Sequence, residues 1–503
     1  MKRGPCIRYL TTGMIAFLIL HACGIFNPQE SEQMDDGNDK PQSVPPVALL
    51  SPVNGSLRQS LSPALHWRSV PNALEYQCQI SGESDFTLIM KDTTLADSTY
   101  TTSDLERNTT YYWRVRATNS SDHGPWSEVR YFTTLSTKYP PPKSFDQWVT
   151  AYFAAWKHFA LPTSNWGNVA TEAIDWDAFT HMIYFGTGAQ ADGSLEPVGP
   201  YQIFSESRFN SIIPAAHQHG VPILFAVGGW GNYTNFSQAI TPEVRDTFID
   251  NLISLMTTWG FDGIDIDMEP IQDSDRDNYT AFINELHARL QTFVTPLLDR
   301  PLLTAAVGWQ PTLFVELQDK FDQINIMTYD YSGAWQGWVT WHNSPVYNGG
   351  YLFPSTGGPL PSANQSIQRY QQAGIPYSKL GIGIDFYGYV WTGVSEPREG
   401  WDTPPAVEDN IPYHDIMATF FQPEYTRWDS AAQAAYLSIS NENPKQFVSY
   451  DNQHSIEAKF TYVRETSLGG LIVWELGGGF RADQPAGKRD LLLQTVKNEL
   501  QME

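Results

Sequence analysis

Eight short apolar runs, separated by segments with helical spacing, recur between residues 147 and 503 and constrain the fold more than any other feature. Continuous apolarity is typical of strands that are buried on both faces, as in a parallel sheet covered by helices. Between the runs, residues 245–259 and 275–293 carry apolar side chains at helical spacing. The pattern predicts an α/β fold, a (β/α)8 TIM barrel over residues 147–503. Its strands begin at Val149, Thr180, Pro222, Gly260, Leu302, Gln323, Lys379 and Gly469.

Residues 45–135 show a different pattern, with short alternating segments between turn residues, which predicts an all-β sandwich. The period of two places Tyr111, Trp113, Val115 and Ala117 on one face of a strand. Together with Trp67, Leu105 and the runs GPWS and FTT, they give a segment that resembles a fibronectin type III domain. We expect a spacer module, followed by a stiff Pro-rich linker at 136–146.

The N-terminus has the features of a secretory signal peptide, predicted at residues 1–22. Basic residues precede the apolar run GMIAFLIL at 13–20, which is too short to span a bilayer. Leu20 to Cys23 resembles a lipoprotein box, which implies lipidation of Cys23; an ordinary signal peptide cut nearby is the alternative. Residues 23–44 predict a flexible tether. The expectation is a secreted bacterial lipoprotein at the outer membrane or cell surface, or else a released extracellular protein, with a lipid anchor as its one membrane contact.

Charge and cysteine content exclude several classes. The formal net charge of −24 disfavours nucleic acids and anionic membranes as partners, since no cationic surplus is present. Three cysteines cannot build a disulfide framework, and Cys78 is predicted to be a small buried residue. Aromatic residues make up 14% of the chain, more than a core requires, and flat aromatic faces suit an oligosaccharide groove.

The fourth apolar run, GFDGIDIDME from Gly260, carries the candidate chemistry. A period of two places Asp265, Asp267 and Glu269 on one face. Burying unpaired carboxylates costs several kcal/mol, so packing alone does not explain them. Carboxyl groups this close together cannot all ionise. One Asp is expected to keep a proton, and Glu269 can be held protonated so that it acts as a general acid. A Ca²⁺ or Mg²⁺ site is the rival interpretation, which activity in a strong chelator would remove.

The pattern D-x-x-D-x-D-x-E at 262–269 resembles the signature of glycoside hydrolase family 18, the chitinases and their relatives. Other matches lie in order on the predicted strands: AVGGW at 226–230, MTYD at 327–330, GIDFYG at 383–388 and GGLIVWE at 469–475. Each motif alone is weak, whereas five in the right order are specific.

The resemblance implies substrate-assisted hydrolysis with retention, in which the acetamido group of the sugar is the nucleophile. Glu269 is then the general acid and base, and Asp267 holds the acetamido N–H and stabilises the oxazolinium intermediate. Asp265, beneath Asp267, shares a proton with it. Tyr329 donates a hydrogen bond to the acetamido oxygen, and Asp330 orients the distorted sugar.

The resemblance also implies a substrate-binding set. Trp474 is the expected floor under the sugar at the cleavage site, and the other contacts are Tyr152, Gly229, Trp230, Met327 and Tyr387. A small α+β insertion at about 392–466 deepens the cleft. No metal or cofactor is implied, the expected partner is chitin or an N-acetylglucosamine oligosaccharide, and a monomer is expected.

Three positions depart from the family pattern. Ala226 replaces a Ser that supports the lower Asp, Met268 replaces an aromatic residue, and Tyr389 lies where many members have Arg. We expect effects on rate and specificity rather than on reaction type. Three functions stay open: a chitinase, an endo-β-N-acetylglucosaminidase acting on glycan cores, and a non-catalytic lectin of the same fold, which the presence of Glu269 disfavours.

Overall fold

The computed structural model describes residues 44–119, 123–134, 139–157, 171–197, 206–401 and 403–502. Cys23 and the predicted signal peptide lie outside these ranges, as does the predicted tether apart from Val44. Within the described ranges, we find no helix with the length and apolarity that a bilayer crossing requires.

Two packed sheets form the all-β domain, as the alternating pattern predicts. The three-stranded sheet has the order β1-β3-β6, and the five-stranded sheet has the order β2-β8-β7-β4-β5. On β7 the side chains of Tyr111, Trp113, Val115 and Ala117 are all buried, and Cys78 lies in the same core. The strands are β1 Leu49–Ser51, β2 Ser56–Gln59, β3 Ala64–Trp67, β4 Glu75–Ser81, β5 Ile89–Leu95, β6 Thr99–Thr101, β7 Thr110–Thr118 and β8 Arg130–Thr134.

The eight predicted runs form eight parallel strands that close into a barrel, because β9 pairs with both β22 and β10. The order around the barrel follows the sequence, and a short strand, β11 (Leu195–Pro197), extends the edge of β10. The barrel strands are β9 Trp148–Ala154, β10 His181–Ala189, β12 Ile223–Gly228, β13 Gly263–Asp267, β14 Leu302–Val307, β15 Gln323–Ile326, β16 Leu380–Asp385 and β22 Gly470–Trp474.

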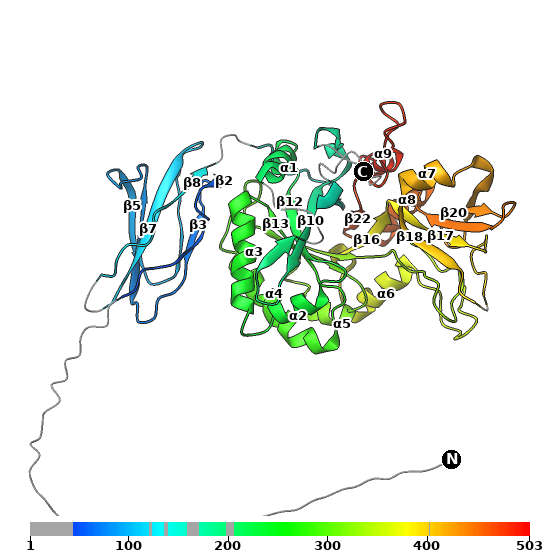
Figure 1. The fold of residues 1–503 in the computed structure, drawn as a ribbon, viewed down its shortest axis with the longest axis horizontal. Helices are drawn as coiled ribbons and strands as arrows, with labels where there is room; N and C mark the ends of the chain where they lie inside the picture. The colour runs from blue at the N-terminus through cyan, green and yellow to red at the C-terminus, as the bar shows by residue number, and fades with distance from the viewer. Residues whose placement is uncertain are drawn as a thin grey trace, which may run out of the picture. The chain divides into compact units, whose positions relative to one another are not determined.

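Helices surround this barrel (Figure 1). Their apolar faces and the outward faces of the strands form the main core. The predicted helices at 245–259 and 275–293 are α3 and α4. The helices are α1 Glu206–Gln218, α2 Tyr233–Ala239, α3 Arg245–Trp259, α4 Arg276–Leu290, α5 Pro311–Leu317, α6 Ala363–Ala373, α8 Gln453–Thr466 and α9 Leu491–Leu500. Short 3-10 turns lie at Ala155–Lys157, Thr171–Ala173, Trp176–Ala178, Asp273–Asp275, Tyr377–Lys379 and Pro423–Tyr425.

A second sheet, five-stranded and antiparallel, lies between β16 and β22 in sequence, with the order β18-β17-β21-β20-β19. It differs in extent from the predicted insertion at 392–466, since its first strand directly follows β16 and its last ends before α8. Helix α8 packs on β16, β22 and α9 of the barrel and also contacts β20 of the second sheet. The elements are β17 Tyr387–Thr392, β18 Ala406–Pro412, α7 Tyr413–Thr419, β19 Thr426–Asp429, β20 Ala434–Ile439 and β21 Gln446–Tyr450.

Candidate active site

Asp265 is the first of three carboxyl side chains on and directly after β13, and it is fully buried. Its Oδ1 accepts a hydrogen bond from the Thr304 hydroxyl at 2.5 Å, and its Oδ2 accepts one from the Tyr152 hydroxyl at 2.9 Å. Burial raises the pKa of Asp265 to about 6, although both hydrogen bonds act to lower it. This carboxyl can therefore gain or lose a proton near neutral pH.

Asp267 and Glu269 follow at the carboxyl end of β13 and share a hydrogen bond. Burial first, and then the neighbouring charges of Glu269 and Asp265, raise the pKa of Asp267 well above its usual range. Burial also raises the pKa of Glu269, while the hydrogen bond from Asp267 and one from the Trp230 backbone lower it. The stack thus holds protons that isolated carboxylates would lose.

One oxygen of this stack is unpaired. Asp267 Oδ1 is buried and has no hydrogen-bond partner among the described residues. Asp267 also lines the cleft described below. A buried acceptor without a partner is costly, so this oxygen is available to a ligand that carries an N–H or O–H donor.

Two glycines let the chain pass close to Asp267. Gly228 and Gly229 have φ of +116° and +98°, a region that favours glycine. A Cβ at Gly228 would lie 2.0 Å from the Asp267 carbonyl oxygen, and the Gly229 N–H donates to that oxygen at 2.7 Å. The adjacent Trp230 is 83% exposed at the barrel mouth.

Tyr329 and Asp330 follow β15. The Tyr329 ring is buried, and no hydrogen bond of its hydroxyl to another described residue is found. Asp330 Oδ1 accepts two hydrogen bonds, from the Tyr387 hydroxyl at 2.6 Å and from the Tyr389 hydroxyl at 2.9 Å. Burial still raises the pKa of Asp330. Tyr387 thus acts on the site through Asp330 and does not itself line the cleft.

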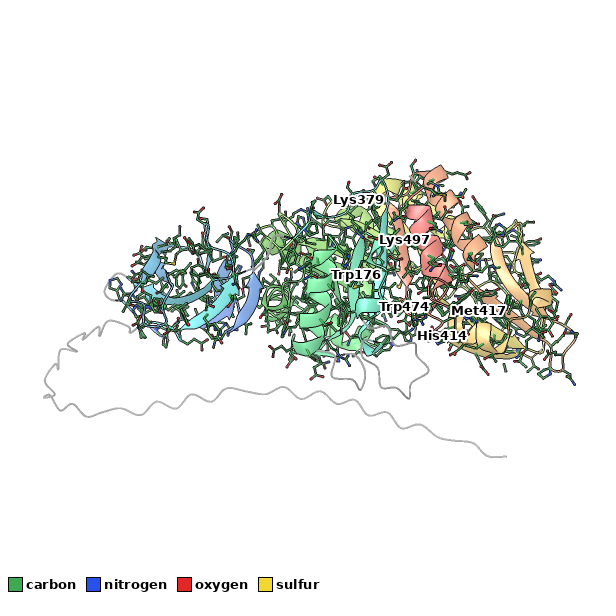
Figure 2. All side chains as sticks on the ribbon, turned by 90° about the horizontal axis from the view of Figure 1, so that it is seen from above. Trp176, Lys379, His414, Met417, Trp474 and Lys497 are labelled. Atoms are coloured by element: carbon green, nitrogen blue, oxygen red, sulfur yellow. The ribbon has the colours of Figure 1, made fainter. Side chains whose placement is uncertain are left out.

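Trp474, which is labelled in Figure 2, ends β22. Two other aromatic rings of the barrel pack against it. The Phe185 ring meets it edge-on at 5.0 Å between centroids, and the Tyr152 ring lies at 5.6 Å. These contacts hold its large apolar face in place at the cleft described below.

A cleft of about 560 Å³ brings most of the predicted residues together at the carboxyl ends of the strands. Asp265 lies beneath it. Sequence reasoning missed Phe185, Ala306, Asp409 and Asn410, of which the last two come from β18 of the small sheet. The predicted residues that line the cleft are Tyr152, Gly229, Trp230, Asp267, Glu269, Met327, Tyr329, Asp330 and Trp474.

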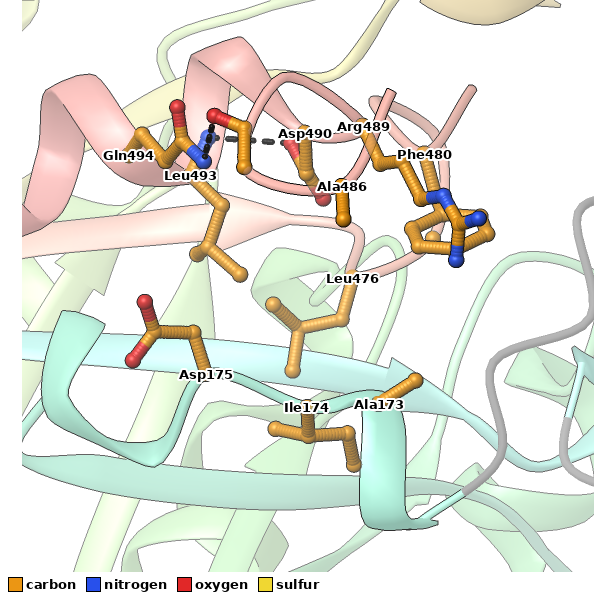
Figure 3. Close-up of a pocket in the computed structure, with 12 residues that line it drawn as sticks. Ala173, Ile174, Asp175, Leu476, Phe480, Ala486, Arg489, Asp490, Leu493 and Gln494 are labelled. Atoms are coloured by element: carbon orange, nitrogen blue, oxygen red, sulfur yellow. Dashed lines mark hydrogen bonds between the residues drawn. The ribbon is translucent and has the colours of Figure 1, made fainter. Parts of the chain in front are cut away.

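A second hollow, of about 250 Å³, lies beside the start of α9 (Figure 3). It is lined in part by Ile174, Leu476 and Leu493, and the half-buried Asp490 caps α9 by accepting from the Leu493 N–H at 3.0 Å. None of the stacked carboxyls lines this hollow.

Asp262, the first acidic residue of the motif, lies away from the cleft. It accepts hydrogen bonds from the Thr295 hydroxyl, from the Ile223 N–H and from His217.

The carboxyls of the stack are hydrogen-bonded to neighbouring side chains, apart from Asp267 Oδ1. Among the described residues, no group of three or more His, Cys, Asp or Glu side chains has the geometry to hold a metal ion. The arrangement instead suits proton transfer, because adjacent carboxyls with raised pKa values can exchange a proton with a bound group.

A TIM barrel with acidic residues at the end of its fourth strand and aromatic residues around them defines a glycosidase-type site. The profile of glycosyl hydrolases family 18 matches residues 149–479. The chain therefore belongs to this family, and its barrel is a glycoside hydrolase domain. Residues 63–136 match the N-terminal immunoglobulin domain of Rha78A-like proteins, so the all-β domain is immunoglobulin-like.

Individual proteins with similar sequences are named as chitinases. Chitinase A1 of Niallia circulans is 29% identical over 308 residues, which cover 52% of this chain and 42% of that protein. A probable endochitinase of Caenorhabditis elegans is 34% identical over 272 residues, which cover 50% of this chain and 43% of that protein. The matches thus span under half the length of these two relatives.

Solved structures share the fold. The group IV chitinase of Ostrinia furnacalis, in complex with allosamidin, superposes with a TM-score of 0.61 at 24% identity, over 71% of this chain and 99% of that one. Human YKL-39, described as a pseudo-chitinase with retained chitooligosaccharide binding, gives a TM-score of 0.59 at 21% identity over 71% of this chain and 100% of that one.

Proposed function

We propose that the barrel is a chitinase that hydrolyses β-1,4-linked N-acetylglucosamine polymers with retention, by substrate-assisted catalysis. The observation that carries the proposal is the unpaired Asp267 Oδ1, which lines a cleft together with Tyr329. An acetamido group has one N–H donor and one carbonyl acceptor, which match a carboxyl oxygen and a phenolic hydroxyl respectively. The relatives named as chitinases support the same substrate class.

In the proposed mechanism, Glu269 protonates the leaving glycosidic oxygen, and the acetamido oxygen attacks the anomeric carbon. Asp267 accepts from the acetamido N–H and stabilises the positive charge of the oxazolinium ion, while Tyr329 donates to the acetamido oxygen. Glu269 then takes a proton from water, which opens the ring of the intermediate with overall retention. Asp265 shares a proton with Asp267, and Trp474 lies under the sugar.

The test is turnover of chitohexaose and of a glycoprotein with N-linked glycans by the full chain, with the product anomer followed by NMR. We expect the β-anomer first and loss of at least about 10³-fold in kcat for Glu269→Gln, with binding kept. Glu285→Gln on α4 is the matched control, since Glu285 pairs with Arg245 on the helical layer. Near-parent hydrolysis by Glu269→Gln would overturn the mechanism.

The other functions left open by the sequence are outcomes of this test. Faster cleavage of the glycoprotein than of chitohexaose would indicate an endo-β-N-acetylglucosaminidase. Binding of chitohexaose with no turnover by the parent would indicate a lectin.

We further infer that the all-β domain is a fibronectin type III-like spacer and that the chain is a secreted lipoprotein anchored through Cys23. Support for the anchor comes from Lys2, Arg3 and Arg8 before the apolar run, and from the box that ends at Cys23. Metabolic labelling with a fatty acid tests it: label is expected on the parent and lost in Cys23→Ala, and label that survives this change would contradict the anchor.

A further inference from the structure

Asp330 has a backbone conformation that needs support. Its φ is +57°, in the left-handed region that residues other than glycine adopt at a cost. The Asp330 N–H donates to Asn343 Oδ1 at 3.0 Å. On the other side of Tyr329, the Thr328 carbonyl accepts from the Ser344 hydroxyl at 2.6 Å. Asn343 and Ser344 therefore bind the backbone of the two residues that flank Tyr329, one on each side.

The side-chain amide of Asn343 is itself fixed in one orientation. Its Nδ2 donates to Asp385 Oδ2 at 2.6 Å, so its Oδ1 must face the Asp330 N–H. Its backbone N–H donates to the Ser449 hydroxyl at 2.7 Å, and its carbonyl accepts from the Tyr331 N–H at 3.1 Å. Asn343 is 1% exposed, so water does not replace these partners.

Behind Asn343 lies a buried charged cluster, which consists of Asp385, Asp451 and Lys459. The Lys459 ammonium, on α8, is fully buried and contacts Asp451, Asp385 Oδ1 at 3.4 Å and the Ser344 hydroxyl at 2.6 Å. The Asp385 N–H donates to Asp451 Oδ2 at 3.2 Å. The cluster therefore contacts both Asn343 and Ser344. Asp385 accepts a hydrogen bond from Asn343, and Lys459 donates one to Ser344.

Such a cluster is a poor device for stability alone. Removing an ammonium and two carboxylates from water costs several kcal/mol per ion, and apolar replacements of equal volume are often neutral or stabilising. What ion pairs supply beyond packing is a fixed direction for each hydrogen bond. Here the hydrogen bonds that start at the cluster lead to the backbone of Thr328 and Asp330, which follow β15.

We propose that Asn343 is a positioning residue for Tyr329 and Asp330, and that the buried cluster of Asp385, Asp451 and Lys459 holds Asn343 in place. The inference rests on the proposed function, because it gives Tyr329 and Asp330 their places beside the acetamido group. Neither Asn343 nor the cluster touches the cleft. Their effect is on the geometry of the two residues that do.

The test compares two buried asparagines. Asn343→Leu removes both side-chain hydrogen bonds, and Asn325→Leu is the matched control, because Asn325 is fully buried on β15 but bonds Trp148 and Gln323. We expect Asn343→Leu to lower kcat on chitohexaose about 30-fold and to change KM less than about threefold. Asn325→Leu is expected to lower Tm comparably while kcat stays within about twofold of the parent.

A second pair of variants tests the route through the cluster. Asn343→Asp keeps an acceptor for the Asp330 N–H but faces the Asp385 carboxyl, so part of kcat should return as the pH falls and the two carboxyls share a proton. The charged groups facing this pair are Asp451 and Lys459. Lys459→Met/Asp451→Asn removes the ammonium with one carboxylate. Combining it with Asn343→Leu should lower kcat by less than the product of the two separate losses, because part of the effect of the cluster passes through Asn343 and only the direct contact of Lys459 with Ser344 is independent of it.

A readout without turnover separates this inference from the proposed function. Affinity for chitobiose thiazoline, an uncharged mimic of the oxazolinium ion, should fall at least about tenfold in Asn343→Leu and stay unchanged in Asn325→Leu. A parent that binds chitohexaose without hydrolysing it would defeat the proposed function alone. Folded Asn343→Leu with parent affinity and parent kcat, or multiplicative losses in the combined variant, would overturn the positioning role.

Discussion

The hydroxyl of Tyr152 on β9 donates to Asp265 Oδ2 on β13 at 2.9 Å, across the interior of the barrel. This bond lowers the pKa of a carboxyl that burial holds at about 6. Tyr152 therefore has two roles in the site, since its ring also packs against Trp474. The acidity of the carboxyl stack and the placement of the Trp474 ring depend on the same side chain.

Tyr152→Phe should move the acid limb of the kcat/KM profile to higher pH by about 0.5 to 1 unit, because Asp265 loses a donor that favours its charged form. The measurement is the pH profile on chitohexaose. Tyr370→Phe is the control, since that buried hydroxyl donates to the Gly308 carbonyl at 2.8 Å and does not contact the stack. An acid limb that stays in place would show that Asp265 does not set it.

Ala226→Ser should move the same limb in the opposite direction. Ala226 is paired in register with Asp265 on the neighbouring strand and is fully buried, so a hydroxyl there can donate to the carboxylate and lower its pKa by about 0.5 unit. The double variant with Tyr152→Phe should lie between the two single variants. An unchanged profile in Ala226→Ser would contradict the expectation that its missing hydroxyl matters.

Trp474→Ala should reduce kcat/KM on chitohexaose about 10- to 100-fold, because it removes the flat ring, packed against Phe185 and Tyr152, on which we propose that the sugar stacks. Trp428→Ala is the control, since Trp428 stacks on His454 at 3.9 Å and does not line the cleft. Equal losses in the two variants would assign the effect to folding rather than to stacking.

Incubation with a strong chelator followed by desalting should leave kcat unchanged. The carboxyl oxygens of Asp265 are engaged with Thr304 and Tyr152, and Asp267 is hydrogen-bonded to Glu269. A metal that took several carboxyl oxygens of the stack would have to displace these bonds, since Asp267 Oδ1 is the one buried oxygen of the stack without a partner among the described residues. Loss of activity that added Ca²⁺ or Mg²⁺ restores would favour the metal interpretation instead.

Asp490→Asn should raise the free energy of unfolding by about 1 to 2 kcal/mol at pH 8 and by less at pH 5. Burial raises the pKa of Asp490 to about 7, so the folded state binds a proton more tightly than the unfolded state. The protein therefore loses stability as the pH rises through this range, and Asn keeps the cap on α9 without the charge. Urea unfolding at both pH values checks it; a gain that is larger at pH 5 would contradict the sign.

The sequence predicted the strands of the barrel and the residues on β13 well, because both depend on local patterns. Continuous apolarity marks strands buried on both faces, and a period of two is enough to place Asp265, Asp267 and Glu269 on one side. The alternation that places Trp113 inside the all-β domain is equally local.

Contacts across the barrel could not be predicted this way. The bonds from Tyr152 and Thr304 to Asp265 depend on how three strands face the barrel interior, which no spacing along one strand gives. Asp409 and Asn410 reach the cleft from β18, in a segment whose fold the sequence outlined only coarsely. Asp385 was seen as part of an approximate motif, while its partners Asp451 and Lys459 lie far along the chain.

The hydrogen bond from Lys459 to Ser344 affects when the site can form during synthesis of the chain. The two residues are 115 positions apart, and α8 is followed in the chain by β22, the last barrel strand. A ribosome must therefore release nearly the whole barrel before the residues beside Tyr329 gain their support. During synthesis, this support can form only after most barrel strands have been made, so a chain that stops before α8 would carry the acidic motif without the Lys459 contact.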